Sequence, residues 1–186
     1  MTGERELDLW AMLNVGSAQA AELCDIVGRM LAAQRKTSTR TSDMAIRFNR
    51  LPSAGDLPLP SRATSGAAGI DLAASRDVAI RTGEWQAVPT GFAVEIPDGY
   101  EGQIRPRSGW AAKFGLTVLN TPGTIDSDYR GEVQVLLINF GRPIQIKRGD
   151  RIAQMVVAPV AMLPIVEVEG LNSTDRGDGG LGSTGR

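Results

Sequence analysis

The 186-residue chain has no histidine and only one cysteine, Cys24. The lack of histidine removes the side chain that most often serves as a general base near neutral pH and most often binds metal ions. Acid–base chemistry must then come from carboxylates, lysines or tyrosines. A single cysteine cannot form an intramolecular disulfide, which fits a reducing compartment and predicts a cytoplasmic location.

The chain also lacks an excess of charge and a long apolar segment. Its formal net charge of −1 argues against a dedicated nucleic-acid-binding protein, which would usually be basic. The longest uncharged run, Ile152 to Val166, is shorter than a membrane span and contains Gln154 and two prolines, which predicts buried β-structure. Charged residues at positions 1–8 and six acidic residues among the first 43 argue against a targeting peptide. We therefore expect neither nucleic acid nor a membrane as a partner.

Residues 1–43 are predicted to form a helical extension followed by a linker. Apolar residues recur at helical spacings of three and four between residue 5 and about residue 34, at Ala20, Leu23, Cys24, Val27, Met30 and Leu31. Residues 34–43 are polar and rich in Ser and Thr, as linkers are. A second interpretation places the natural start at Met44, which would make the upstream residues a mis-start.

Residues 44–171 are predicted to form an all-β domain of the jelly-roll or sandwich type. Strand-sized runs alternate with turns rich in Gly, Pro and Asp, a pattern typical of this fold class. Only 108–114 looks able to form a short helix, and the glycine-rich tail 172–186 has little to bury, so we expect it to be mobile without a ligand. The expected strands are 45–49, 69–74, 77–80, 84–96, 102–106, 116–120, 132–140, 144–147, 151–157 and 165–167.

The stretch Gly123 to Glu132 has the most unusual composition. It places Asp126, Asp128, Tyr129 and Arg130 within five consecutive positions, between two β-rich runs that predict a hairpin with a neighbouring turn. A buried hairpin has no need of these four side chains at its tip. A solvated turn is the alternative for this stretch taken alone.

Four further stretches accompany it in the order 68–72 (AGIDL), 106–113 (PRSGWAAK), 149–154 (GDRIAQ) and 176–185 (RGDGGLGSTG). The five stretches together resemble the motifs of the homotrimeric dUTPase family, over residues 44 to 186. The resemblance implies a jelly-roll-like trimer, with sites shared between subunits, that hydrolyses dUTP to dUMP and pyrophosphate with Mg²⁺. Such an enzyme lowers dUTP and supplies dUMP for thymidylate synthesis.

On this resemblance Asp126 is the catalytic residue, which activates the water that attacks the α-phosphorus. Asp128 is expected to support the turn rather than to react. Tyr129 resembles the tyrosine that packs under the deoxyribose and leaves no room for a 2′-hydroxyl. An ordinary aromatic residue at a strand end is the alternative.

The uracil edge is expected to meet Asn120 and the backbone of Gly123, Thr124 and Ile125, because an amide can pair in both directions with O4 and N3. A narrow hairpin leaves no space for the 5-methyl group of thymine. Gln134, on the returning strand, is a further candidate for the same slot.

The phosphates are expected at Arg107, Ser108 and Gly109, where backbone N–H groups at a helix start favour anions. The resemblance places Ser108 on the oxygen that bridges the α- and β-phosphates, makes Arg107 more a strut to a carboxylate than a ligand, and adds Gln154 as a phosphate contact. Asp150 and Arg151 are equally well interpreted as a surface turn pair.

Asp71 resembles the first-motif aspartate near the metal. No direct protein ligand to Mg²⁺ is expected, because the triphosphate and waters hold most of its coordination sphere, so Asp71 would act through water. The alternative is a buried structural partner of an arginine.

The tail is expected to close over the γ-phosphate, because glycine-rich backbone, hydroxyls and one guanidinium suit an anion. Leu181 stands where the family often has an aromatic ring, which predicts weaker stacking on the base. The tail residues concerned are Arg176, Gly180, Leu181, Gly182, Ser183 and Thr184.

Two alternatives to the diphosphatase stay open. One is a dCTP deaminase or a bifunctional deaminase–diphosphatase on a related scaffold. The other is a non-catalytic trimeric β-protein that binds a nucleotide or a protein partner. The apolar run around Met162 and Leu163 is expected to pack either between subunits or in the core of one chain.

Overall fold

The computed structural model describes residues 44–180. This part of the chain is dominated by β-strands, and no helix in it is long and apolar enough to span a membrane. The predicted helical extension and linker before residue 44, and the tail beyond residue 180, lie outside the described residues. The strands are β1 (Arg47–Arg50), β2 (Ile70–Ala73), β3 (Val78–Ile80), β4 (Trp85–Glu95), β5 (Tyr100–Pro106), β6 (Leu116–Val118), β7 (Gly123–Ile125), β8 (Glu132–Asn139), β9 (Ile144–Ile146) and β10 (Arg151–Pro159).

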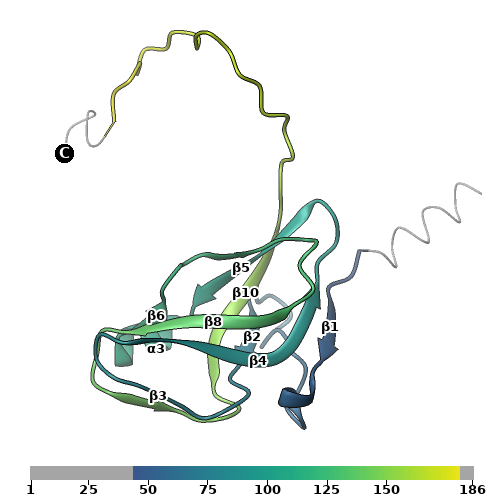
Figure 1. Cartoon of the computed structure of the whole chain (residues 1–186), viewed down its shortest axis with the longest axis vertical. Coiled ribbons are helices and arrows are strands. Elements are labelled where there is room, and N and C mark those ends of the chain that lie inside the picture. The colour runs from purple at the N-terminus through teal and green to yellow at the C-terminus, as the bar shows by residue number, and fades with distance from the viewer. Residues whose placement is uncertain (1–43, 181–186) are drawn as a thin grey trace, which may run out of the picture.

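The strands form two four-stranded sheets and a two-stranded ribbon (Figure 1). The first sheet has the order β1-β4-β8-β6, the second has the order β2-β10-β5-β7, and β3 pairs with β9. Every pairing is antiparallel. The expected all-β class is therefore confirmed.

One apolar core joins the two four-stranded sheets. Val88 and Val135 of the first sheet belong to the same buried cluster as Leu72 and Met155 of the second. On β8 the burial alternates residue by residue, so Val133, Val135 and Leu137 face the core. This period-two pattern is the one from which a half-buried strand is predicted.

A buried amide closes the end of β8. Asn139 is fully buried, and its Nδ2 donates to the carbonyl oxygens of Ile80 and Arg142 at 3.0 and 2.8 Å. Its Oδ1 accepts the Gly141 N–H at 2.9 Å. Because every polar atom of this amide has a partner, its burial is tolerated and the turn after β8 is fixed.

The short helical elements are η1 (Pro52–Ala54) and α3 (Ser108–Phe114). The α3 bounds match the predicted helix. It ends at Gly115, which has φ +67° and donates its N–H to the Ala111 carbonyl, as left-handed C-terminal caps do.

Surface contacts tie the turn between β9 and β10 to Asp56, which follows η1, and to Asp77, which precedes β3. Arg148 Nη2 lies 2.8 Å from Asp56 Oδ1, and the Arg148 N–H donates to Asp77 Oδ1 at 2.8 Å. The side-chain hydrogen bond from Arg148 lowers the pKa of Asp56, and the Arg148 backbone hydrogen bond lowers the pKa of Asp77. Both carboxylates are therefore charged at neutral pH, and the anchor persists there.

Two strand predictions were wrong. The residues 123–125 were interpreted as part of a turn. They form β7, which belongs to the second sheet and pairs with β5. The expected strand 165–167 is absent. Its residues belong to an irregular segment that follows β10 and arches away from the body of the molecule (Figure 1).

The same segment corrects the prediction of buried structure up to Val166. Met162, Leu163 and Ile165 are each at least 79% exposed, so the apolar residues after Pro159 have no place in the core of this chain. We call residues 160–171 the apolar arm.

Candidate active site

A first cavity of about 280 Å³ lies at the seam between the two sheets. One wall is β8 of the first sheet, and the opposite wall is β7, which belongs to the second sheet because it pairs with β5. The loop after β6 closes one side. The cavity is lined by Ile104, Asn120, Gly123, Thr124, Ile125, Asp126, Tyr129, Glu132, Val133, Gln134 and Leu136.

Asp126 is the first residue after β7 and is exposed at this cavity. Its backbone carbonyl accepts the Tyr129 N–H at 3.2 Å, which fixes the turn. Within residues 44–180 its carboxylate has no hydrogen-bond or ion-pair partner. A carboxylate that lines a cavity and is not engaged by the protein can orient a water molecule and accept its proton.

Tyr129 is held by its hydroxyl group, which donates to the Glu132 carbonyl at 2.9 Å. The ring lies over Gly131, where an added Cβ would collide with the phenol oxygen. Tyr129 is 43% exposed and lines the cavity. The lack of a side chain at Gly131 therefore leaves room for the ring in this position.

The beginning of β8 is fixed by a β-bulge in β4. The pairing register of β4 and β8 shifts between Pro89 and Ala93. The Glu132 carboxylate accepts the Gly91 N–H of this bulge at 2.8 Å, and the buried Thr90 hydroxyl donates to the Val133 carbonyl at 2.7 Å. These bonds hold the strand end from which Tyr129 is positioned.

The two charged residues next to Tyr129 do not line the first cavity. Arg130 Nη1 donates to the carbonyl oxygens of Ser127 and Tyr129 at 2.6 and 2.8 Å, which stabilises the turn. Asp128 lies outside the first cavity.

A second cavity, of about 550 Å³, lies between α3 and the loop that leads into β2. Ser108 and Gly109, at the start of α3, are exposed to it. It has no lining residue in common with the first cavity. Its lining consists of Ala63, Ala67, Ala68, Gly69, Asp71, Arg107, Ser108, Gly109, Trp110, Lys113, Phe114 and Gln154.

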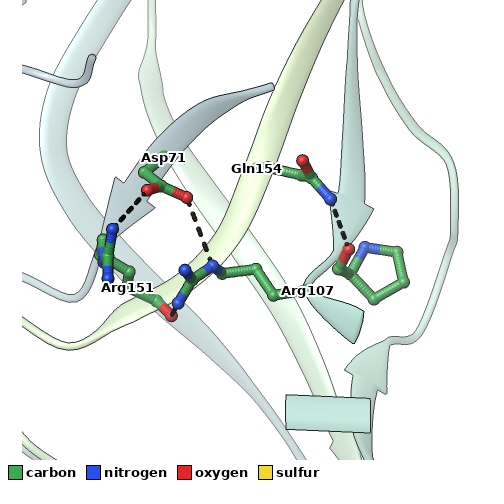
Figure 2. A network of polar contacts seen from close by, with 5 residues as sticks. Asp71, Arg107, Arg151 and Gln154 are labelled. Carbon is green, nitrogen blue, oxygen red and sulfur yellow. Dashed lines mark hydrogen bonds and ion pairs between the residues drawn. The ribbon is translucent and has the colours of Figure 1, made fainter. Parts of the chain in front are cut away.

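A polar network joins strands β2, β5 and β10 beside the second cavity (Figure 2). Asp71 Oδ1 lies 3.3 Å from Arg107 Nε, and Asp71 Oδ2 lies 2.9 Å from Arg151 Nη1. Arg107 Nη1 also donates to the Arg151 carbonyl at 2.9 Å. Asp71 thus pairs with two guanidinium groups.

Gln154 occupies the other side of this network. Its Nε2 donates to the Pro106 carbonyl at 3.0 Å (Figure 2). An added Cβ at Gly69 would collide with Gln154 Oε1, so glycine is needed there for the amide to keep this position. The backbone of the loop and the Gln154 amide therefore meet directly.

The family model described as dUTPase matches residues 56–185, which is more than half of the chain. The chain belongs to the dUTPase family. The family resemblance carried by the five motifs is thereby confirmed.

Relatives and solved structures of dUTPases agree with this assignment. The deoxyuridine 5′-triphosphate nucleotidohydrolase of Methylocella silvestris is 56% identical over 147 residues, which cover 76% of this chain and 92% of that protein. The one from Rhizobium meliloti is 59% identical over 141 residues, which cover 73% of this chain and 88% of that protein.

Two solved dUTPases from phages share the fold. The Staphylococcus bacteriophage 80alpha dUTPase with dUPNHPP has a TM-score of 0.69 at 26% identity and covers 76% of this chain and 99% of its own. A mutant dUTPase from phage phi11 of S. aureus, with a coordinated structural Mg(II) ion, has a TM-score of 0.63 at 25% identity and covers 68% of this chain and 97% of its own.

The motifs of this dUTPase-family chain divide between the two cavities. Asn120, Asp126, Tyr129 and Gln134 meet at the first cavity, with Gly123, Thr124 and Ile125. Arg107, Ser108, Gly109, Gln154 and Asp71 meet at the second. Arg176 and Gly180 line neither cavity, and Leu181, Gly182, Ser183 and Thr184 lie outside the described residues.

Sequence reasoning missed several lining residues of this dUTPase fold. Glu132 and Leu136 share a face of β8 with Gln134, so the period of two along the strand could have identified them. Lys113 and Trp110 follow Ser108 on α3 and line the second cavity. For Ala63 and Ala67 no local signal exists, because a loop of small residues becomes a wall only through the tertiary fold.

Proposed function

We propose that this chain hydrolyses dUTP to dUMP and pyrophosphate, with the nucleoside in the first cavity and the triphosphate in the second. The observation that carries the proposal is the composition of the first cavity. It combines two amides, one aromatic ring and a carboxylate that has no partner within residues 44–180. These are the groups needed to read a base, pack a sugar and activate water.

The base would lie between β7 and β8. An added Cβ at Gly123 would lie 3.1 Å from Asn120 Nδ2, so glycine allows the backbone of β7 to approach the Asn120 amide closely. The amide and the backbone from Gly123 to Asp126 would then offer donors and acceptors to the uracil edge, with Gln134 on the opposite wall. Cytosine would present the wrong pattern, and the lost hydrogen bonds would weaken its binding.

The reaction would be one in-line displacement. Asp126 would accept a proton as the water oxygen forms its bond to the α-phosphorus, and the bond from that phosphorus to the bridging oxygen would break, so that its electron pair leaves with pyrophosphate. Ser108 would donate a hydrogen bond to this bridging oxygen as its charge develops. Gln154 and Arg107 would help to hold the phosphates.

Mg²⁺ fits this arrangement as an ion held by the substrate. Among residues 44–180 no three acidic or cysteine side chains gather into a metal cluster, and Asp71 is the single carboxylate that lines the second cavity. Asp71 would meet a metal-bound water rather than the ion, because both its oxygens already face guanidinium groups. When bound, Mg²⁺ would neutralise charge on the triphosphate.

A complete site would need more than one copy of the chain, and we propose a homotrimer. The two cavities have no lining residue in common, so one nucleotide would use the first cavity of one copy and the second cavity of a neighbour. The apolar arm is exposed on the isolated chain, which favours packing between subunits over packing within one core. The glycine-rich tail beyond it would close over the γ-phosphate.

A nucleotide panel tests the proposed activity. With Mg²⁺, pyrophosphate release is expected from dUTP, and at least about a hundredfold less from dTTP, dCTP or UTP, because buried hydrogen-bonding sites discriminate strongly. Ammonia release from dCTP would instead support the deaminase alternative. Consumption of dTTP or UTP with dUTP left intact would reject the proposal.

Gly131→Ala tests the role of Tyr129 against ribose. The new methyl group would push the phenol ring from its position, whereas the backbone itself would not be strained because Gly131 has no positive φ. The ratio of kcat/KM for dUTP over UTP is expected to fall by about tenfold, since exclusion of a hydroxyl depends on a close steric fit. Steady-state kinetics with both nucleotides measures this ratio.

Gly66→Ala is the matched control, because nothing lies within 4 Å of its added Cβ, the residue has no positive φ and it lines neither cavity. It should leave the ratio unaltered. If Gly131→Ala also kept the ratio of the parent chain, Tyr129 would not be the group that excludes ribose.

A further inference from the structure

Arg151 lies beside the second cavity without lining it. It is the first residue of β10, and the pairing register of β10 with β2 shifts between Arg151 and Ala153. Its side chain is 54% exposed, whereas its partner Asp71 is only 18% exposed. An ion pair of a half-exposed arginine usually contributes little to stability. Any larger role of Arg151 must therefore come from the residues that it contacts.

Arg151 contacts two charged residues that line the second cavity, Asp71 on β2 and Arg107 directly after β5. Its guanidinium group pairs with Asp71 Oδ2 at 2.9 Å, and its carbonyl accepts Arg107 Nη1 at 2.9 Å (Figure 2). Arg107 Nε in turn lies 3.3 Å from Asp71 Oδ1. The three residues form a closed ring of contacts between β2, β10 and the N-cap of α3, and Arg107 directly precedes Ser108.

The charges explain why such a ring is needed. A cavity for a triphosphate must keep an acidic side chain from repelling the substrate, and two guanidinium groups offset the charge of Asp71. Without Arg151, the Asp71 carboxylate would lose the partner of its Oδ2 and would be held by Arg107 alone, so it could turn within the cavity. Arg107 would then have to follow it, because its Nε pairs with the same carboxylate.

We propose that Arg151 is a positioning residue for the phosphate cavity, which acts by fixing Asp71 and Arg107 and has no contact with the nucleotide. The inference rests on the proposed function, in which the triphosphate occupies the second cavity. This role differs from the interpretation of Arg151 as part of a surface turn pair, which assigns it no function in the site.

A double-mutant cycle of Arg151→Met and Asp71→Asn tests the proposal. Arg151→Met should raise KM for dUTP about five- to tenfold, and Arg151→Lys should recover part of this loss because an ammonium group can still pair with Asp71. Added to Asp71→Asn, the Arg151→Met change should cost less than about twofold more, because residues that act through one another are not additive. The dissociation constant of the dUTP analogue dUpNHpp, measured with Mg²⁺, should change in the same variants and in the same direction as KM.

Arg81→Met is the matched control. Arg81 forms a surface pair with Glu84 at 3.5 Å and lines neither cavity, so KM should not change. Thermal melting of every variant separates a loss of fold from a loss of positioning, since a purely structural role would lower Tm with KM unaltered. The Arg151→Lys variant keeps the test open if Arg151→Met fails to fold.

Two outcomes would overturn the proposal while the proposed function stands. In one, Arg151→Met has the KM and kcat of the parent chain, although Ser108→Ala weakens dUpNHpp binding. In the other, the losses from Arg151→Met and Asp71→Asn add fully, which would mean that Arg151 contacts the substrate itself. If Ser108→Ala leaves dUpNHpp binding unaltered, the second cavity is not the phosphate site and both conclusions are wrong.

Discussion

Asp126→Asn is expected to abolish hydrolysis of dUTP while the protein still folds and binds nucleotide. Asparagine has nearly the shape of aspartate, but it cannot accept the proton of the attacking water. Loss of a general base lowers kcat by about 10²- to 10⁴-fold. Because the Asp126 carboxylate has no partner within residues 44–180, its replacement breaks no side-chain contact of the described fold, and Tm should stay close to that of the parent chain.

Pyrophosphate release measures kcat, and titration with dUpNHpp measures binding. The dissociation constant should change by less than about threefold, because the interaction that is lost belongs to the transition state. Asp128→Asn is the matched control, since it removes the same charge from the same turn at a residue outside the cavity. Near-normal turnover by Asp126→Asn, or an equal loss in both variants, would reject Asp126 as the base.

The strands that the sequence predicts are those whose strand-forming residues lie between clear turn signals. The run 132–140 was expected as a β-rich run bounded by turns, and the structure gives β8 as Glu132–Asn139, paired with Leu116–Val118. β7 escaped prediction because only Thr124 and Ile125 separate Thr-Pro-Gly from Asp-Ser-Asp, so the segment was interpreted as part of a turn. Only its pairing with β5, in which Gly123 lies opposite Ile104 and Ile125 lies opposite Gly102, makes it a strand.

For the apolar arm, the sequence left two locations open, between subunits or in the core of one chain. The hydrophobicity of Met162, Leu163 and Ile165 predicts that they are buried. It does not indicate whether the same chain or another subunit buries them. These side chains are exposed in the structure, so they are not part of the core of the same chain. Burial by another subunit is a quaternary property, and no spacing within one sequence encodes it.

The sequence indicated which residue types the candidate site contains, but it did not indicate how all of them are arranged in space. Asp126, Tyr129 and Asn120 fall within ten consecutive residues, so their meeting at one cavity follows from a local turn. The pairing of Asp71 with Arg107 and Arg151 joins residues far apart along the chain, and no short-range pattern predicts it. The separation of the motifs into two cavities likewise required the fold.

Mixing two inactive variants is expected to restore activity, and this is the largest effect that the separation of the cavities predicts. One variant is Asp126→Asn in the first cavity. The other combines Ser108→Ala and Gln154→Ala in the second. If each site takes its first cavity from one copy and its second from a neighbour, random mixed trimers contain about one intact site in four, because each half is intact with a chance of one half.

The two proteins are co-refolded in equal amounts, trimers are isolated by size with light scattering, and pyrophosphate release from dUTP is measured. Activity near a quarter of the parent level is expected, although each variant alone is nearly inactive. A mixture of Asp126→Asn with Asp126→Ala is the control, and it should stay inactive because every first cavity lacks its base. If the complementary pair also stays inactive as a stable trimer, the site lies within one chain. The two cavities would then have to be joined by movement of the segments between them rather than by assembly.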